Sequence, residues 1–265
     1  MKSLNGKELA GFIKERQAHQ VRALKTRKIT PTLLIIRDSF DPVIAKYVNL
    51  KIKYGTDIGV NVIDYVAKNT ADIETKITEA NEDSEIHGII LQLPIKDKTE
   101  TDRLTSLITP KKDVDGLSGK PEAYDSATAT AITWLLAGYD INLDGKKIAL
   151  VGRGKLVGAP LYRIFTDSGR DVTLFHRGSD LTKLKDFDII ITATGVPGLI
   201  SNDYVSPSIV IVDAGTASEN GVLKGDVADA VRSRTDLAAI TPVIGGVGPL
   251  TITCLFDHVI NAAEK

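Results

Sequence analysis

The sequence has few cysteines and histidines, the residues from which disulfides and many zinc sites are built. Cys254 is the one cysteine among 265 residues, so an internal disulfide and a cysteine-only zinc site are excluded. The four histidines lie far apart in the sequence and follow no metal-binding spacing. We therefore expect no metal site, and we expect the Cys254 thiol, which lies in an apolar stretch, to be a small buried side chain.

Long apolar runs and an excess of charge of one sign are also lacking. No apolar run approaches the length that crosses a bilayer, and the first residues lack the apolar core of a secretory signal. The net charge of -1 gives no support for nucleic-acid binding through a basic surface. We expect a cytoplasmic protein with neither a membrane nor a nucleic acid as its partner.

Helical periodicity alternates along the chain with short apolar runs. The helical patterns cover residues 8–24, 42–58, 72–83, 98–108, 127–140 and 250–265. The apolar runs, which suit buried strands, cover residues 30–38, 60–66, 86–94, 146–152, 171–176, 188–194 and 208–215. This alternation predicts an α/β fold with largely parallel sheets, in two successive units.

The segment AKYVNLKIK, residues 45–53, places Tyr47 four residues before Lys51. Asp41 and Pro42 predict a helix start, with an N-cap followed by a first-turn proline. On a helix the phenol and the ammonium project from one face. The pair is either a site or part of an ordinary amphipathic helix whose lysine extends to water, and for an isolated pair the second alternative is the commoner.

The segment IALVGRGKLVGAPLYRIF, residues 148–165, has the order of a dinucleotide site: a buried strand, a glycine turn and a helix. Its glycines, Gly152, Gly154 and Gly158, follow the spacing GxGxxxG, one residue longer than the usual fingerprint. Glycine backbone and a helix N-terminus would still offer N–H groups to phosphates. The alternative is a tight turn that binds nothing.

The next predicted strand is followed by FHRGSD, residues 175–180, where a site for NAD would carry an acidic residue. Arg177, with Ser179 close by and Arg153 in the glycine turn, suits a 2'-phosphate and favours NADP over NAD. The alternative is that Arg177 is a solvated loop residue. Small residues also follow the last two strands. The candidate cofactor-binding residues are Gly152, Arg153, Gly154, Val157, Gly158, His176, Arg177, Ser179, Thr194, Gly195, Asp213 and Gly215.

Five segments in order resemble the bifunctional methylenetetrahydrofolate dehydrogenase/methenyltetrahydrofolate cyclohydrolase family. They are YVNLKIK from Tyr47, GIILQLP with Gln92, PKKDVDG with Asp115, GRGKLVGAP from Gly152, and TPVIGGVGPLT from Thr241 to Thr251. The resemblance implies an N-terminal α/β catalytic domain, residues 1–138, completed by a C-terminal helix, residues 249–265. It also implies a Rossmann-like NADP-binding domain, residues 139–248, a folate cleft between the domains, and a homodimer.

The activity implied by this resemblance is oxidation of 5,10-methylenetetrahydrofolate by NADP⁺, followed by hydrolysis of the methenyl product to 10-formyltetrahydrofolate. Such one-carbon derivatives serve purine biosynthesis. Hydride transfer needs positioning, whereas hydration needs a proton-transfer group, which the resemblance assigns to Lys51. Gln92 would orient the amine, and Tyr47 would pack against the pterin. Asp115 would accept the paired N–H groups of the pterin ring, while Asp113 serves the turn.

The substrate-binding residues implied by the resemblance come from both ends of the chain. They are Tyr47, Lys51, Gln92, Leu93, Pro94, Asp115, Gly248, Pro249, Leu250 and Thr251. Without the resemblance, Asp115 would be interpreted as a turn residue, and the segment from Gly248 to Thr251 as a plain helix entry.

The sequence also departs from the family pattern. Ile44 and Gly154 replace common serines, Ile244 replaces a common proline, SATA at residues 126–129 lacks two prolines, and the segment 117–127 is short. Two alternatives therefore stay open. One is a dehydrogenase with weak or no cyclohydrolase activity, for which either NADP or NAD is open as the cofactor. The other is a non-catalytic folate- or nucleotide-binding protein on the same fold, against which the presence of Lys51 argues.

Overall fold

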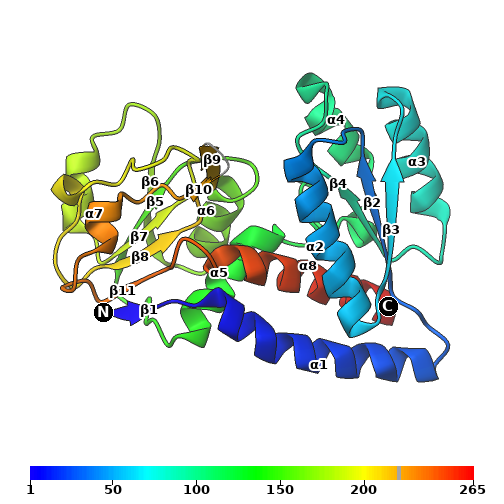
Figure 1. Ribbon diagram of the computed structural model, residues 1–265, viewed down its shortest axis with the longest axis horizontal. Helices are drawn as coiled ribbons and strands as arrows, with labels where there is room; N and C mark the ends of the chain where they lie inside the picture. The colour runs from blue at the N-terminus through cyan, green and yellow to red at the C-terminus, as the bar shows by residue number, and fades with distance from the viewer. Residues whose placement is uncertain (220–221) are drawn as a thin grey trace. The chain divides into compact units, whose positions relative to one another are not determined.

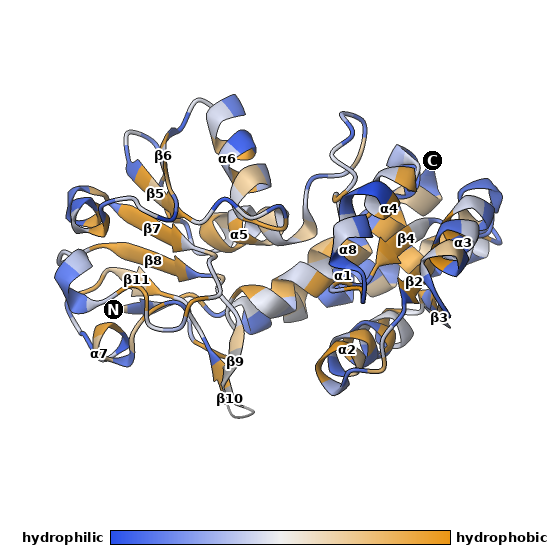
Figure 2. Cartoon of the chain, turned by 90° about the horizontal axis from the view of Figure 1, so that it is seen from above, coloured by the Kyte–Doolittle hydropathy of each residue, from blue (hydrophilic) through white to orange (hydrophobic). Residues whose placement is uncertain are grey.

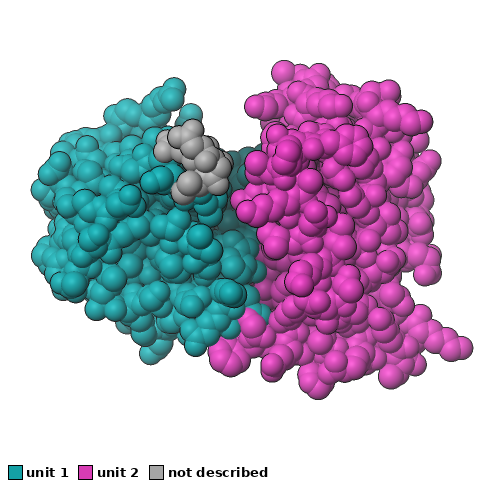
Figure 3. Space-filling model, viewed as in Figure 1, with its two compact units in different colours: residues 1–10, 128–251 teal, residues 11–127, 252–265 magenta. Residues whose placement is uncertain are grey.

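The computed structural model describes residues 1–219 and 222–265 and divides the chain into two compact units (Figure 3). Unit 1 contains residues 1–10 and 128–251, and unit 2 contains residues 11–127 and 252–265. These limits differ from the domain limits expected from the sequence. The first strand and the helix after residue 127 group with unit 1, because the strand pairs into its sheet and Leu9 packs against Gly138 of that helix.

Unit 2 is built on a three-stranded parallel sheet in the order β3-β2-β4 (Figure 1). Its strands are β2 (Thr32–Arg37), β3 (Asn61–Val66) and β4 (Gly88–Leu91). The helices, with two short 3-10 turns, are α1 (Gly6–Thr26), α2 (Pro42–Ile58), α3 (Thr70–Glu82), η1 (Lys98–Glu100), α4 (Thr101–Leu107) and η2 (Pro110–Lys112), with the first residues of α1 in unit 1. Each predicted strand and helix of this region is present.

From residue 252 onward, the C-terminal helix α8 (Val247–Glu264) belongs to unit 2. Phe256 of α8 is fully buried and stacks on Tyr54 of α2, with ring centroids 5.2 Å apart. Gln17 of α1 donates a hydrogen bond to the carbonyl of Thr253 at 2.9 Å. Cys254 is fully buried in the same helix, and burial raises the pKa of its thiol. The last helix therefore supplies part of the core of unit 2.

Unit 1 is built on a six-stranded sheet in the order β1-β11-β8-β7-β5-β6, in which every pairing is parallel. Its strands are β1 (Lys2–Ser3), β5 (Lys147–Val151), β6 (Asp171–Phe175), β7 (Ile189–Thr192), β8 (Val210–Asp213) and β11 (Ala239–Ile240). A separate antiparallel pair is formed by β9 (Ala217–Glu219) and β10 (Val222–Lys224). The helical elements are α5 (Ala127–Gly138), α6 (Gly158–Asp167), η3 (Leu181–Asp186), η4 (Asn202–Tyr204) and α7 (Asp229–Arg232). The four strands predicted for this region are present as β5, β6, β7 and β8.

The central strands of both sheets are hydrophobic, because parallel strands are covered on both faces (Figure 2). In each sheet the chain runs from a central strand to one side and then returns to the other side. This reversal lies between β2 and β4 in unit 2, and between β5 and β7 in unit 1. Open α/β sheets bind ligands outside the carboxyl ends of their strands at such points. Within the described ranges, none of the helices has the length and apolar character needed to cross a membrane.

Candidate active site

Helix α2 carries Lys51 on its buried side. The Asp41 side chain caps the helix by accepting hydrogen bonds from the backbone N–H groups of Val43 at 2.8 Å and Ile44 at 3.3 Å, which confirms the predicted start. The buried residues of α2 are Ile44, Val48, Gly55 and Ile58. Lys51 falls in this series, because it follows Val48 by three residues and precedes Gly55 by four. Its stem is therefore directed toward the interior, whereas Tyr47, one turn earlier, keeps 40% of its surface exposed.

Gln92, directly after β4, is the hydrogen-bond partner of Lys51. The Lys51 Nζ donates to Gln92 Oε1 at 2.6 Å. Gln92 itself is fixed at two points, since its backbone N–H donates to Ile36 O at 2.8 Å and its Nε2 donates to Leu93 O at 3.1 Å. The expected contact between Lys51 and Gln92 is thus present. It joins α2, which follows β2, to the end of β4, where the strand order of the sheet in unit 2 reverses. Leu93 and Pro94, two expected substrate contacts, follow Gln92 and are joined by a cis peptide bond.

Two aspartates in the segment KKDVDG have different surroundings. Asp113 is buried and accepts hydrogen bonds from the N–H groups of Gly116, Leu117 and Ser118 at 2.8–3.2 Å. This confirms that Asp113 serves the turn. Asp115 takes no part in that cap, and its backbone carbonyl accepts from Ala127 N at 3.4 Å. The Asp115 carboxyl therefore lies at the site without being consumed by the turn.

Lys51 and Asp115 interact electrostatically, although both side chains keep some exposure. Desolvation lowers the pKa of Lys51 from its ordinary value, and the charge of Asp115 opposes this by raising it. Desolvation raises the pKa of Asp115, while Lys51 lowers it and Asp113 raises it. Burial is the first influence on both groups, so each charged form is disfavoured relative to water. A lysine amine in this position is neutral at a lower pH than an exposed lysine.

Arg37 and Asp38, at the carboxyl end of β2, were not singled out from the sequence. Arg37 donates from Nε and Nη2 to the two carboxylate oxygens of Asp64 at 2.9 and 2.8 Å, and from Nη1 to Ser39 O at 2.9 Å. Asp38 accepts from Lys96 N. These bonds hold the chain that enters α2. Two adjacent charges directly after a buried apolar run were the available signal, since such charges are seldom buried unless paired.

In unit 1 the glycine turn follows β5 and leads into α6. Gly152 has a φ of 108°, and a Cβ on it would lie 2.7 Å from Ala193 O. A Cβ on Gly158 would lie 2.0 Å from Gly152 O, whereas one on Gly154 would meet nothing within 4 Å. The turn therefore requires glycine at the first and third positions only. The space at Gly154 explains why a departure from the family pattern is tolerated there. Val157 is the N-cap of α6 without a side-chain hydrogen bond.

Arg153 and Arg177 occupy equivalent places on neighbouring strands. Val151 of β5 pairs with Phe175 of β6, and each arginine follows its strand by two residues. Both arginines are exposed. Next to Arg177, the backbone N–H of His176 donates to Ser179 Oγ at 3.0 Å, so that this hydroxyl keeps its own hydrogen for a further acceptor. Two cations and a hydroxyl donor thus gather at the adjoining ends of β5 and β6.

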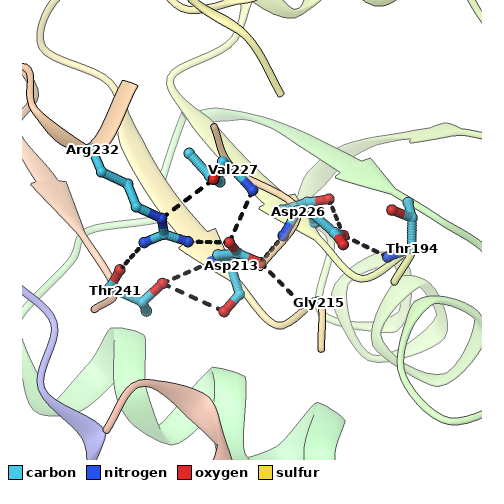
Figure 4. A network of polar contacts seen from close by, with 8 residues as sticks. Thr194, Asp213, Gly215, Asp226, Val227, Arg232 and Thr241 are labelled. Atoms are coloured by element: carbon cyan, nitrogen blue, oxygen red, sulfur yellow. Dashed lines mark hydrogen bonds and ion pairs between the residues drawn. The ribbon is translucent and has the colours of Figure 1, made fainter. Parts of the chain in front are cut away.

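The loops after β7 and β8 are joined by a buried polar network (Figure 4). Asp226 accepts hydrogen bonds from Thr192 Oγ1 at 2.7 Å and Thr194 N at 2.6 Å. Asp213 accepts from the N–H groups of Gly215, Asp226 and Val227 at 3.0–3.1 Å and pairs with Arg232. Asp213 was expected to bind the cofactor, but its carboxylate is committed to these internal donors. Thr194, Gly195 and Gly215 lie at loop positions that the network holds.

The remaining expected substrate residues form the first turn of α8 and belong to unit 1. Leu250 is fully buried, and Thr251 Oγ1 donates to Val247 O at 3.4 Å. Gly248 is exposed and Pro249 is partly buried. The structure thus brings Lys51, Gln92 and Asp115 together in unit 2, with Tyr47 one turn before Lys51 on α2, and the Gly248–Thr251 segment belongs to unit 1. Among the departures, Ile44 and Ser126 are buried, whereas Ile244 is 79% exposed.

Comparisons with known proteins give matches along nearly the whole chain. Residues 4–115 match the family model "Tetrahydrofolate dehydrogenase/cyclohydrolase, catalytic domain", and residues 126–265 match its "NAD(P)-binding domain". The chain is 36% identical to "Bifunctional protein FolD" of Macrococcus caseolyticus over 277 residues, which covers 100% of this chain and 98% of that protein. A protein of the same name from Staphylococcus aureus is also 36% identical, with 100% and 96% covered.

Solved structures give the same result. The bifunctional methylenetetrahydrofolate dehydrogenase/cyclohydrolase from Campylobacter jejuni is 30% identical with a TM-score of 0.94, covering 100% of this chain and 99% of that chain. The Trypanosoma brucei enzyme, solved with NADP cofactor and an inhibitor, is 26% identical with a TM-score of 0.87, covering 99% and 97%. The chain belongs to the tetrahydrofolate dehydrogenase/cyclohydrolase family.

Proposed function

We propose that this protein oxidises 5,10-methylenetetrahydrofolate with NADP⁺ and hydrolyses the methenyl product to 10-formyltetrahydrofolate. The contact of 2.6 Å between Lys51 Nζ and Gln92 Oε1, on the buried side of α2, is the observation that carries the proposal. The bifunctional relatives and the NADP complex of the Trypanosoma brucei enzyme support it. Unit 2 would hold the reacting part of the folate, and unit 1 would hold the dinucleotide.

Hydration is the step for which the chain supplies a proton-transfer group. Because desolvation lowers the pKa of Lys51, the neutral amine that can accept a proton from the attacking water forms at a lower pH than in an exposed lysine. The hydrogen bond to Gln92 uses one N–H of this amine, which directs the nitrogen lone pair elsewhere. Gln92 therefore acts as an orienting group. A neutral amide suits this task, because a carboxylate in its place would favour the protonated lysine.

Binding and orientation of the folate would fall to Asp115 and Tyr47. The Asp115 carboxylate is desolvated and outside the Asp113 cap, so two adjacent N–H donors of a 2-amino-4-oxopyrimidine ring would satisfy both of its oxygens. The exposed ring of Tyr47 offers a flat apolar surface one helical turn from Lys51. These two contacts would set the distance between the one-carbon unit and the amine. Leu93, Pro94 and the segment from Gly248 to Thr251 stay predicted substrate contacts.

NADP, when bound, supplies the acceptor of the hydride. The residues of unit 1 fit this cofactor, since the glycine turn leaves backbone N–H groups free of side-chain crowding, and Arg153, Arg177 and Ser179 suit a 2'-phosphate. The loop residues next to the nicotinamide would be Thr194, Gly195 and Gly215. Since the Asp213 carboxylate is already satisfied, we assign it to shaping these loops and not to contact with the cofactor.

A spectrophotometric assay with methylenetetrahydrofolate and each cofactor tests the proposal. We expect NADPH to form together with 10-formyltetrahydrofolate, and NAD⁺ to be a weaker substrate. Accumulation of methenyltetrahydrofolate in place of the formyl product would indicate a dehydrogenase alone. Absence of NADPH and NADH formation would indicate a binding protein and would overturn the proposal.

The homodimer, the cytoplasmic location and the role in purine biosynthesis belong to the same proposal and rest on the family resemblance. Closed symmetric pairs are the commonest assemblies of such enzymes. Light scattering at micromolar concentration would test the homodimer, and a strictly monomeric active enzyme would contradict it.

A further inference from the structure

The main chain directly before Asp115 is held by a side chain from the other end of the sequence. His258, in the C-terminal half of α8, is buried, and its Nδ1 lies 2.8 Å from the carbonyl oxygen of Val114. A carbonyl only accepts hydrogen bonds, so Nδ1 carries the hydrogen in this contact. Burial also lowers the pKa of His258, which favours the neutral ring with that hydrogen on Nδ1. Each of these residues belongs to unit 2.

The imidazole of His258 is itself held in place by Tyr124. The two rings are stacked, with centroids 4.6 Å apart and an interplanar angle of 21°. Tyr124 lies in the short segment that follows Asp115, and Lys265 Nζ lies over its ring, 5.3 Å from the centroid. The Tyr124 hydroxyl is buried without a hydrogen-bond partner among the described residues. It is thus the aromatic ring of Tyr124, not its hydroxyl, that contributes to this arrangement.

The rest of the turn around Asp115 is fixed from other directions. Asp113 forms a parallel β-bridge with Ile89 of β4, and its carboxylate caps the turn. The buried Val114 side chain packs closely on Gly88, where a Cβ would lie 2.9 Å from it. After Asp115, the positive φ of 69° at Gly116 allows the chain to turn back. These contacts leave the orientation of the Val114–Asp115 peptide plane to be fixed. His258 contacts the carbonyl oxygen of that peptide.

We propose that His258 is a positioning residue for substrate binding, because it fixes the peptide from which the Asp115 side chain projects. This inference rests on the proposed role of Asp115 in binding the pterin ring. Without the His258 N–H, a buried carbonyl would lose its partner and the peptide would gain freedom to rotate. The carboxylate would then be misplaced relative to the two N–H donors that it must meet together.

The kinetic consequence separates this role from a general effect on folding. A misplaced Asp115 weakens folate binding, so the KM for methylenetetrahydrofolate should rise while the KM for NADP⁺ stays unchanged. We expect a rise on the order of tenfold, which corresponds to about 1.4 kcal/mol of binding free energy. The effect should require only the donor at the position of Nδ1, since no other atom of the ring contacts the turn through a hydrogen bond among the described residues.

Two substitutions of His258 test the proposal against each other. His258→Leu keeps much of the bulk and removes the donor, whereas His258→Asn places an amide N–H close to the position of Nδ1. We expect His258→Leu to raise the folate KM about tenfold, and His258→Asn to restore it to within about threefold of the parental value. His19→Leu, at an exposed position of α1, is the matched control and should change neither KM. Equal effects of the two His258 substitutions, or equal rises in both KM values, would overturn the proposal.

Two further measurements keep the test decisive. The dissociation constant of tetrahydrofolate, measured by calorimetry, reports the same loss of binding without turnover. A parental protein that binds tetrahydrofolate but does not oxidise the methylene derivative would refute the proposed function and not this inference. If His258→Leu does not fold, Tyr124→Leu removes the stacked ring and should weaken folate binding severalfold. Parental affinity in Tyr124→Leu would then overturn the role of His258.

Discussion

At the scale of single residues, the ionisation of Lys51 depends on two opposing influences. Desolvation lowers its pKa, and the negative charge of Asp115 raises it. Gln92, which accepts a hydrogen bond from the Lys51 amine, carries no charge. The site therefore offers one charged and one neutral neighbour whose replacement should move the lysine pKa in opposite directions.

We predict that Gln92→Glu shifts the pH profile of the cyclohydrolase step to higher pH, and that Asp115→Asn shifts it to lower pH. The step requires the neutral amine, so its rate rises as the pH passes upward through the pKa of Lys51. A carboxylate at position 92 raises that pKa, and loss of the Asp115 charge lowers it. The kcat for methenyl hydrolysis, corrected for the uncatalysed rate, measures both shifts. Shifts in the same direction would contradict this account of Lys51.

Arg177 provides a second residue-scale prediction. Arg177→Ala should raise the KM for NADP⁺ on the order of tenfold, because a charge-assisted contact to a phosphate contributes about 1.5–3 kcal/mol. The KM for NAD⁺, which lacks the 2'-phosphate, should change little. Lys185→Ala removes an exposed cation elsewhere in unit 1 and serves as the control. Equal weakening toward both cofactors would remove the basis for assigning Arg177 to the phosphate.

Several site residues could be predicted from the sequence because their local pattern determines their position. The helix start at Asp41 and Pro42 fixes the face shared by Tyr47 and Lys51. The capping role of Asp113 followed from its place before a glycine. Asp213 could not be judged in this way, since its partners Asp226 and Arg232 follow it by more than ten residues and meet it only in the folded sheet.

At the scale of elements, the strand, glycine turn and helix from β5 to α6 could be predicted from the sequence. Which of the three glycines the turn requires could not. The sequence contains three glycines in one turn. Only the folded chain reveals that the backbone of the loop after β7 approaches Gly152, and that Gly158 packs on the carbonyl of Gly152. Spacing alone does not distinguish such close approach from open space.

We therefore predict different outcomes for substitutions at these glycines. Gly158→Ala and Gly152→Ala should weaken NADP⁺ binding on the order of tenfold or more, because a Cβ meets backbone at 2.0 and 2.7 Å and must displace the turn. Gly154→Ser should retain the parental affinity within about twofold, since that position is open. Titration with NADP⁺ gives the dissociation constants. Comparable losses in all three variants would show that the turn does not act as described.

Other elements were absent from the prediction because they are too short to carry a period. β1 and β11 contribute two residues each, and their pairing joins Lys2 to Ala239 across most of the chain. The paired strands β9 and β10 contribute three residues each. Apolar runs of five or six residues, as in β2 and β5, were recognisable since burial on both faces requires continuous hydrophobicity.

At the scale of the whole molecule, the chain leaves unit 2 after residue 127 and returns to it at residue 252. The returning part of α8 carries Phe256 into the core, and it also carries His258 to the turn of Asp115. The family resemblance predicted this return. Periodicity predicted the helix, but it could not assign the helix to a unit.

This organisation predicts that Phe256→Ala destabilises unit 2 although the residue lies close to the C-terminus. Removing a fully buried phenylalanine that stacks on Tyr54 should cost about 3–5 kcal/mol. Phe12→Ala, at a position 68% exposed in α1, should change the free energy of unfolding by about 0.5 kcal/mol or less. Urea unfolding curves measure both values. A similar small change for the two variants would mean that α8 does not form part of the core.

The central claim is that one chain performs two chemical steps, of which only hydration needs the amine of Lys51. Lys51→Met keeps the length of the stem and removes the amine, so it tests this most directly. With methylenetetrahydrofolate and NADP⁺, we expect NADPH formation to persist at least in part, hydrolysis to 10-formyltetrahydrofolate to fall nearly to the uncatalysed rate, and methenyltetrahydrofolate to accumulate. A Lys51→Met enzyme that hydrolyses methenyltetrahydrofolate at the parental rate would contradict the account.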